Sequence, residues 1–392
     1  MSWINILNQN WLFHFSSANV TSHLDETPTS VYNIEKVKSM NRLKAITLLL
    51  FTALISSISF AQDEIVQATI LDSADTQADK LYNSGIVQYQ NKKYKAAISD
   101  FTESLKLRDG FEPAYFNRAV CKSEEGNLIG AIEDFDKAIA LVADKPEAWY
   151  LRGQAKYKSK DIEGATTDFT QTTTLNSGHA QAHYYKGVIK FEASEYEGAI
   201  EDFTKAVIAD KRHAYAYNDR GSAKRQIDDV DGAILDYKKA LLVDDNMAFT
   251  HNNLGSALRK KGDIKGAVKS YSKAISLDRS YHIAYNNRGS AYFDSGDYDE
   301  AIKDFSRVIE LKADYAFAYN NRASAKFKLL DYQGCIDDCT KAIEIDANYS
   351  YAYQNRGSAK ELLRDEAGAC ADWKKAAELG AEGVKSFVGI CK

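Results

Sequence analysis

Residues 282–315 read HIAYNNRGSAYFDSGDYDEAIKDFSRVIELKADY, and this 34-residue stretch decides the fold because the chain repeats its pattern. Its Gly289 recurs as a small residue at intervals of 34. The nine members of this series are Gly85, Ala119, Gly153, Gly187, Gly221, Gly255, Gly289, Ala323 and Gly357. A period this regular predicts a solenoid in which one helical hairpin is stacked many times. Such a fold presents a long surface rather than a pocket, so we expect it to bind other proteins.

Further positions of the unit recur at helical spacing. Twelve residues after each small residue comes Ala, or Cys in one unit, and four residues later comes a ring in all but one unit. The second series is Phe101, Phe135, Phe169, Phe203, Tyr237, Tyr271, Phe305, Cys339 and Trp373. Small and large residues at such spacing predict two closely packed antiparallel helices. Turns such as Gly296-Asp297 separate the helices, because Gly ends one helix and Asp caps the next.

The pattern resembles the tetratricopeptide repeat, whose consensus places an aromatic residue, Leu-Gly, Tyr, Ala, an aromatic residue, Ala and Pro within 34 residues. The closing Pro is missing here. The resemblance covers residues 78–383 and implies an all-α fold, a right-handed α–α superhelix of about nine hairpins. The expected units are 78–111, 112–145, 146–179, 180–213, 214–247, 248–281, 282–315, 316–349 and 350–383. Residues 381–392 have apolar side chains at helical spacing, so we expect a helix that caps the last hairpin.

The first 61 residues lie outside the repeats. A basic start at Met40, an apolar run over residues 45–60 and small residues ending at Ala61 predict a signal peptide over 40–61. The alternative is a membrane anchor, but the apolar run is shorter than the roughly 20 residues that a span needs. We expect residues 1–39 to be a gene-model extension or disordered, and 62–77 to be a flexible leader. Cleavage near Ala61 would export the chain to the periplasm or the extracellular space.

Four of the five cysteines lie in the last 58 residues. Cys370, in the last hairpin, and Cys391, in the cap, are candidates for a disulfide in an exported chain. Cys335 and Cys339 replace the small residue and the ring of the eighth unit, which favours two small buried side chains. No His lies among these cysteines and no Cys-x-x-Cys spacing occurs, so we expect no zinc site.

Six units carry Arg directly before the small residue and Asp sixteen residues later. The pairs are Arg118–Asp134, Arg152–Asp168, Arg220–Asp236, Arg288–Asp304, Arg322–Asp338 and Arg356–Asp372. In the sixth unit both charges are lost together, as Leu254 and Ser270, and the fourth unit has Lys186 with Asp202. The first unit breaks the rule, since it keeps Asp100 but has Ser84 in place of Arg. The correlated loss in the sixth unit predicts a structural ion pair, since the planar guanidinium suits a carboxylate. The pair would join the two helices of a hairpin or two neighbouring hairpins. The alternative is a row of Arg that binds carboxylates of a partner.

Positions five and six of the units place Asn on the first helix, which lines the concave groove in the family that the chain resembles. The groove candidates are Asn218, Asn252, Asn286 and Asn320 in one row, Asn253, Asn287, Asn321 and Asn355 in the other, and Ser256, Ser290, Phe249, Phe293, Phe317 and Phe327 beside them. An Asn amide can donate to and accept from a peptide backbone, and exposed rings anchor partners. The rows resemble the asparagine ladder of protein O-GlcNAc transferases, which implies an extended peptide. The alternative is that these amides bond within the solenoid.

The charge and the absence of recognisable motifs narrow the range of functions that we expect. The net charge is −5 with acids and bases interspersed, which does not favour nucleic-acid binding. No phosphate loop, nucleophile elbow or metal cluster is recognisable, so we expect no catalysis, cofactor, metal or small-molecule substrate. His179 and His183 have metal-like spacing, but His183 takes the place of a Tyr or Trp, which favours packing. We expect a scaffold for a protein or extended peptide, with a membrane involved only through an uncleaved signal segment. The alternative is a permanent structural subunit of a cell-envelope assembly.

Overall fold

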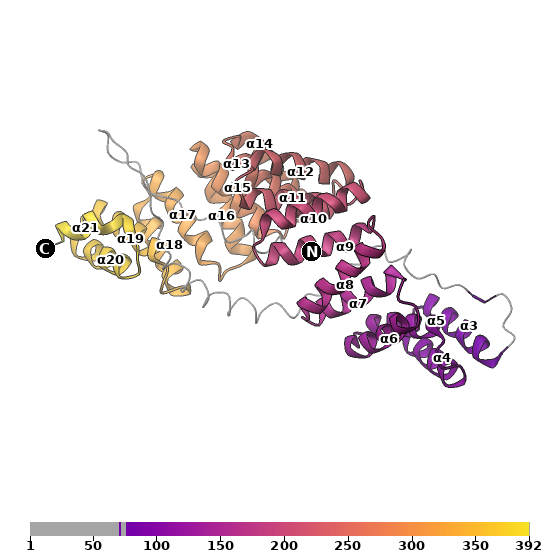
Figure 1. Ribbon diagram of the computed structural model, residues 1–392. Helices are drawn as coiled ribbons and strands as arrows, with labels where there is room; N and C mark the ends of the chain where they lie inside the picture. Colours follow the sequence, from indigo (N-terminus) through magenta and orange to yellow (C-terminus); the bar gives the residue numbers. More distant parts are fainter. Residues whose placement is uncertain (1–69, 72–75, 392) are drawn as a thin grey trace. The chain divides into compact units, whose positions relative to one another are not determined.

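The computed structural model describes residues 70, 71 and 76–391 (Figure 1). The predictions for residues 1–39, 40–61 and most of 62–77 lie outside this part of the chain. Within it, every regular element is a helix. None of these helices combines the length and the apolar character needed to cross a lipid bilayer.

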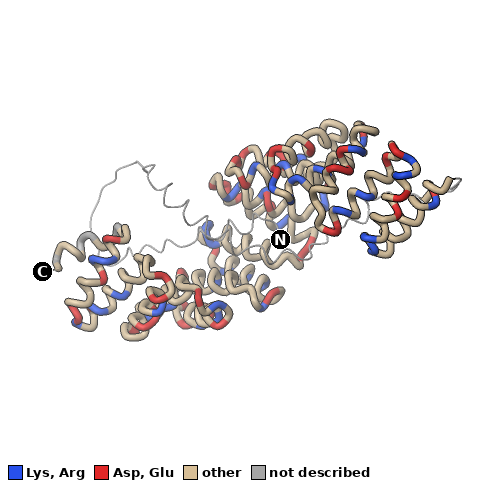
Figure 2. Tube along the Cα trace, turned by 90° about the horizontal axis from the view of Figure 1, so that it is seen from below, with Lys and Arg blue, Asp and Glu red and all other residues tan. Residues whose placement is uncertain are grey.

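Eighteen consecutive helices of the described chain pair as nine hairpins, which confirms the predicted all-α array. The first helices are α3 (Gln77–Gln90), α5 (Glu112–Glu124), α7 (Pro146–Lys158), α9 (Ala180–Glu192), α11 (Ala214–Gln226), α13 (Ala248–Lys260), α15 (His282–Ser295), α17 (Ala316–Lys328) and α19 (Ser350–Leu362). The second helices are α4 (Tyr94–Leu107), α6 (Leu128–Leu141), α8 (Ile162–Leu175), α10 (Tyr196–Ala209), α12 (Val230–Val243), α14 (Ile264–Leu277), α16 (Tyr298–Leu311), α18 (Tyr332–Ile345) and α20 (Glu366–Glu378). Each second helix also packs against the first helix of the next hairpin, so the hairpins stack in chain order (Figure 1). Charged residues of both signs are spread along the stack (Figure 2).

The two helices of a hairpin approach each other where the small residue meets the ring. A β-carbon placed on Gly255 of α13 would lie 2.7 Å from Cε1 of Tyr271 on α14, too close for an ordinary contact. In the eighth hairpin the ring is replaced by Cys339 and the small residue is Ala323, both fully buried. The smaller partner leaves room for one methyl group. The two positions do not always change together, because Ala119 of the second hairpin is buried in the same hairpin as the ring of Phe135.

Side-chain caps begin six of the second helices. The capping residue accepts a hydrogen bond from the backbone N–H of a Gly three residues later, at 2.9–3.0 Å. The caps are Asn127, Asp161, Asp229, Asp263, Asp331 and Asp365. Asp297 makes no such bond, although Gly296 before it adopts the expected left-handed conformation with a φ of 85°. Its carboxylate instead accepts from the hydroxyl of Ser295 at 2.7 Å.

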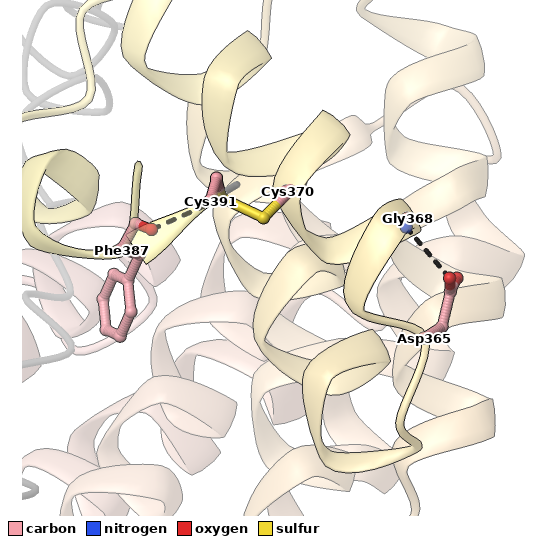
Figure 3. Close-up of a disulfide and its surroundings, with 5 residues drawn as sticks. All are labelled: Asp365, Gly368, Cys370, Phe387 and Cys391. Carbon is pink, nitrogen blue, oxygen red and sulfur yellow. Dashed lines mark hydrogen bonds between the residues drawn. A yellow bond between two sulfur atoms is a disulfide. The ribbon is translucent and has the colours of Figure 1, made fainter. Parts of the chain in front are cut away.

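The last hairpin is covered by a short 3₁₀ helix, η3 (Glu382–Val384), and by α21 (Lys385–Ile390). The ring of Phe387 stacks on Trp373 of α20 with centroids 4.9 Å apart. A disulfide joins Cys370 of α20 to Cys391, directly after α21 (Figure 3). These contacts hold the cap on the apolar end of the array. The other three cysteines are free thiols and are buried: Cys121, Cys335 and Cys339.

Candidate functional site on the first helices

Each of the six expected Arg–Asp pairs forms inside one hairpin. Nε and Nη2 of the Arg, on the first helix, donate to both carboxylate oxygens of the Asp, on the second helix, at 2.6–2.9 Å. The pairs are Arg118–Asp134, Arg152–Asp168, Arg220–Asp236, Arg288–Asp304, Arg322–Asp338 and Arg356–Asp372. This two-point geometry gives strong charge-assisted hydrogen bonds. Because the Asp already occupies the guanidinium, these Arg residues do not form a free row for a partner's carboxylates.

Two further partners, which the sequence analysis missed, complete this clamp. In the fifth hairpin Nζ of Lys224 lies 2.9 Å from Oδ2 of Asp236. Nη1 of Arg220 also donates to Oγ1 of Thr204 in the preceding hairpin at 3.1 Å. The Arg therefore joins two hairpins as well as two helices. Both partners leave a signal in the sequence: Lys follows Arg by one helical turn, and a hydroxyl precedes it by sixteen residues.

The first, fourth and sixth hairpins depart from the clamp. In α3–α4 the hydroxyl of Ser84 donates to Oδ2 of Asp100 at 2.7 Å. In α9–α10 the carboxylate of Asp202 pairs with Nζ of Lys190 at 2.5 Å. In α13–α14 Leu254 takes the place of the Arg, is 7% exposed and packs in one apolar cluster with Tyr237 of the preceding hairpin. The hydroxyl of Ser270 donates only to the carbonyl of Gly266 within its own helix. The sixth hairpin thus lacks the ionic contact between its own helices, and Leu254 makes an apolar contact with the preceding hairpin.

The two Asn rows bond to each other across hairpins. Nδ2 of the Asn at position six donates to Oδ1 of the Asn at position five of the preceding hairpin, at 2.9–3.2 Å. The pairs, which we call the amide ladder, are Asn253–Asn218, Asn287–Asn252, Asn321–Asn286 and Asn355–Asn320. Apart from Asn355, which is half-buried, these residues are at most 6% exposed. This geometry corresponds to the alternative in which the amides bond inside the solenoid, and little amide surface is left for a partner.

The two candidate serines differ in their partners. Oγ of Ser256 donates to the carbonyl of Asn252 at 3.0 Å and accepts from the hydroxyl of Tyr271 at 3.2 Å. In the next hairpin Phe305 replaces the tyrosine. There Oγ of Ser290 and Nδ2 of Asn286 have no hydrogen-bond partner in the described chain. Both residues are only 1% exposed, so they lie too deep to contact a partner directly.

Two of the candidate rings close the tips of their own hairpins. The ring of Phe293 packs edge-on against Tyr298, and that of Phe327 packs edge-on against Tyr332, with centroids 5.2 and 5.3 Å apart. In each case a residue near the end of the first helix meets the first residue of the second helix. The geometry explains both rings by packing within a hairpin.

The other two candidate rings belong to an apolar row at position two of the first helices. The apolar row consists of Tyr215, Phe249, Ile283, Phe317 and Tyr351, all at least partly exposed. Phe249 stacks on Tyr215 with centroids 5.8 Å apart, and Phe317 is 36% exposed beside Tyr349. Consecutive first helices from α11 to α19 contact one another. The row therefore runs along one continuous face.

Histidines serve as helix caps in this array. Nδ1 of His213 accepts from the backbone N–H of Ala216 at 3.1 Å, and its Nε2 lies 3.1 Å from Oε1 of Gln181. Burial lowers the pKa of His213 to about 4, so the ring is neutral at pH 7. His179 caps α9 in the same way, and His183 is buried. Residues 70–71 and 76–391 contain no group of three or more His, Cys, Asp or Glu placed to hold a metal ion.

Three protein-family models match parts of the chain, and all three describe the same repeat. One, a TPR repeat, matches residues 255–296. Two others, both described as tetratricopeptide repeats, match residues 282–315 and, in two overlapping places, 150–211 and 189–246. No curated protein matches the sequence.

Several solved structures are similar to this chain. The crystal structure of MamA is 33% identical with a TM-score of 0.39, over 42% of this chain and 96% of that one. YrrB, described as a TPR protein with an unusual peptide-binding site, is 19% identical with a TM-score of 0.44, over 48% and 96%. PilF of Pseudomonas aeruginosa is 17% identical with a TM-score of 0.47, over 54% and 96%. From the nine stacked hairpins and the matches to the repeat models we conclude that the chain belongs to the tetratricopeptide-repeat family.

Proposed function

We propose that this array is a non-catalytic scaffold that holds an extended segment of a partner protein against the first helices of hairpins five to nine, α11 to α19. The matches to tetratricopeptide-repeat models support a protein as the partner. The observation that carries the proposal is the apolar row on a face whose helices are tied together by the amide ladder.

The apolar row would supply anchors for the partner on a preorganised support. Partly exposed rings such as Phe317 and Tyr351 offer apolar area with few rotatable bonds, and such rings dominate binding energies at interfaces. The amide ladder fixes the spacing of the first helices before a partner arrives. A face that does not have to order itself loses less entropy on binding. We therefore assign recognition to the apolar row and the support of that row to the amide ladder.

Selection of peptides from a random displayed library on chain 62–392 tests this function. Enriched peptides are then made synthetically and their affinities measured by fluorescence anisotropy. The double variant Phe317→Ala/Tyr351→Ala is expected to weaken binding at least tenfold, since two anchors are lost. The matched control is Leu242→Ala on α12, where an 86% exposed side chain lies on a second helix. Equal weakening by both variants, or no enriched peptide, contradicts the proposal.

We further propose that the chain acts outside the cytoplasm, after cleavage of the signal peptide near Ala61. The disulfide between Cys370 and Cys391 supports this location, because such bonds persist in oxidising compartments. Mass spectrometry of the native protein is expected to find an amino terminus at Gln62. Peptides from residues 1–39, or a reduced Cys370 in the native protein, would contradict it. A single stoichiometric partner that never exchanges would favour the alternative, a permanent subunit of an envelope assembly.

A further inference from the structure

Consecutive first helices meet through a recurring contact near their carboxyl ends. The hydroxyl of Tyr157 on α7 donates to Oε1 of Glu192 on α9 at 2.8 Å. In the same way, Nε of Arg259 on α13 donates to Oδ2 of Asp294 on α15 at 2.5 Å. The two residues of each contact are 35 positions apart in the sequence. At these two junctions a donor at position twelve of one hairpin therefore meets an acid at position thirteen of the next.

Arg225 occupies the donor position on α11, but no acid follows it. The residue 35 positions later is Lys260, another cation, and its Nζ pairs with Asp228 at 2.5 Å. Arg225 itself is half-buried, and its guanidinium forms no hydrogen bond or ion pair within the described residues. The pattern that satisfies Arg259 thus leaves the guanidinium of Arg225 without a counter-ion. A partly desolvated charge in this state is unfavourable until an anion reaches it.

The surroundings of Arg225 include the hydroxyl groups of Tyr237 and Tyr271, and the carboxylates of Asp219 and Asp236 also act on Tyr237. Burial raises the pKa of Tyr237 and Tyr271, and the positive charge of Arg225 opposes this rise in both, which places Arg225 between hairpins five and six. The hydroxyl of Tyr237 lies 3.1 Å from Oγ of Ser222. The sixth unit, residues 248–281, has seven Lys or Arg against two Asp, a net charge of +5. Residues 214–247, the unit of Arg225 itself, carry a net charge of −2, so the two units together carry +3, which favours an approaching anion.

We propose that Arg225 binds a side-chain carboxylate, Asp or Glu, of the partner segment held on the first helices. This inference rests on the proposed function and adds the chemistry of the partner. Arg is suited to the task because its planar fork can hold both oxygens of a carboxylate. The existing pair between Lys260 and Asp228 is largely exposed, with side chains 50% and 79% accessible, and such pairs contribute little. Lys260 can thus leave Asp228 at little cost and offer the partner's carboxylate a second cation.

The displayed-peptide selection on chain 62–392 also tests this inference, using peptides amidated at the carboxyl terminus in the affinity step. Enriched peptides are expected to share an Asp or Glu at one fixed place relative to their apolar residues. Replacing that acid by its amide is expected to weaken binding at least tenfold. Arg225→Gln should produce the same loss, and the two changes together no further loss. Arg225→Glu should favour peptides with Lys or Arg at that place.

The matched control is Arg259→Gln, which removes the same charge at the same helical position from an Arg that already pairs with Asp294. It is expected to change affinity less than threefold, with circular dichroism confirming that each variant is folded. Equal weakening by Arg225→Gln and Arg259→Gln would overturn the inference, because it would reflect net charge alone. Enriched peptides without a shared acid would overturn it while leaving the proposed function standing. No enriched peptide on the unaltered chain would overturn both.

Discussion

The fifth and sixth hairpins have helices of the same length and the same central tyrosine, but only the fifth joins its two helices by an ion pair. In α11–α12 the carboxylate of Asp236 receives Arg220 and Lys224. In α13–α14 the Arg position is Leu254, and Ser270 bonds only within its own helix. Both interfaces are buried and both hairpins have the same length. A hairpin of this length therefore forms without the ionic clamp, which is not a requirement of the fold, while Leu254 packs against Tyr237 of the preceding hairpin.

The two hairpins are nevertheless coupled by charge. Residues 214–247 contain five Lys or Arg and seven Asp or Glu, a net charge of −2, against +5 for residues 248–281. Lysines of the sixth hairpin form ion pairs with acidic residues of the fifth. Lys273 pairs with Asp245 at 2.8 Å, and Lys260 pairs with Asp228 at 2.5 Å. Exposed pairs of this kind are screened by salt, so they contribute little to the stability of the two hairpins.

Removing the Asp of the ionic clamp should give the largest difference in stability between the fifth and sixth hairpins. Asp236→Ala leaves Arg220, which is 8% exposed, and Lys224 without their carboxylate counter-ion. Breaking a buried pair in this way costs about 3–5 kcal/mol. Hydrogen exchange of the α11 and α12 amides measures the loss locally, which suits an array that does not unfold in two states. Ser270→Ala, at the equivalent position of the sixth hairpin, is expected to cost at most about 1 kcal/mol. Similar losses in both hairpins would show that the clamp contributes no more than the apolar contact.

Acid should destabilise the fifth hairpin through a group that the sixth lacks. His213 caps α11, whereas Met247 at the same position makes no side-chain cap on α13. Burial lowers the pKa of His213 to about 4, from about 6.5 in the unfolded chain. The unfolded chain therefore binds the proton first, and the stabilisation present above pH 6.5 is lost as the pH falls to 4. The full shift corresponds to about 3 kcal/mol.

Hydrogen exchange of α11 and α13 between pH 7 and pH 4, corrected for the intrinsic exchange rate, measures this difference. His213→Asn keeps a capping side chain and removes the titration, so the extra acid sensitivity of α11 should disappear. If it persists in the variant, carboxylates rather than His213 cause it.

Adding a methyl group at the contact between the two helices should destabilise the two hairpins to different extents. The added β-carbon of Gly255→Ala would lie 2.7 Å from Cε1 of Tyr271, whereas that of Gly221→Ala would lie 3.0 Å from Cε1 of Tyr237. Overpacking of this kind costs about 1–3 kcal/mol, and we expect the larger loss at Gly255. Thermal unfolding of the two variants measures the order. A smaller loss at Gly255 would show that Tyr271 can move aside more easily than Tyr237.

The regular contacts could be predicted from one sequence because the chain repeats each of them. The correlated loss of charge at Leu254 and Ser270 indicated the Arg–Asp pair without any second sequence. The amide ladder offered no such signal. Asn218 and Asn253 belong to rows that stay Asn through most of the later units, so their pairing across 35 residues produces no correlated change.

The contacts of the candidate rings and of Arg225 could not be predicted from the sequence, for a different reason. Phe293 suits a groove or a hairpin tip equally well by composition, and only its contact with Tyr298 decides between them. The missing counter-ion of Arg225 becomes visible once position twelve is known to meet position thirteen of the next hairpin. The Arg259–Asp294 contact establishes that meeting. Contacts between repeats depend on how the hairpins stack, and a period within the sequence does not report this.

The smallest expected effect comes from converting the fifth hairpin into the sixth. The triple variant Arg220→Leu/Lys224→Leu/Asp236→Ser transfers the residues of Leu254, Leu258 and Ser270 to α11–α12. Replacing a whole buried ionic network by apolar side chains is often neutral or stabilising, whereas removing one member is costly. We therefore expect the triple variant to lie within about 1 kcal/mol of the unaltered chain, by the same hydrogen-exchange measurement of α11 and α12.

The single change Asp236→Ser is the internal control, since it removes the carboxylate but leaves both cations in place. Its loss of stability should be several times larger than that of the triple variant, although it carries fewer substitutions. Thr204 loses the guanidinium in the triple variant but keeps its bond to the carbonyl of Ile200 at 2.6 Å, so no buried hydroxyl is left unpaired. A triple variant as unstable as Asp236→Ser would mean that the sixth hairpin depends on its own neighbours. Its apolar contact would then not be a general substitute for the clamp.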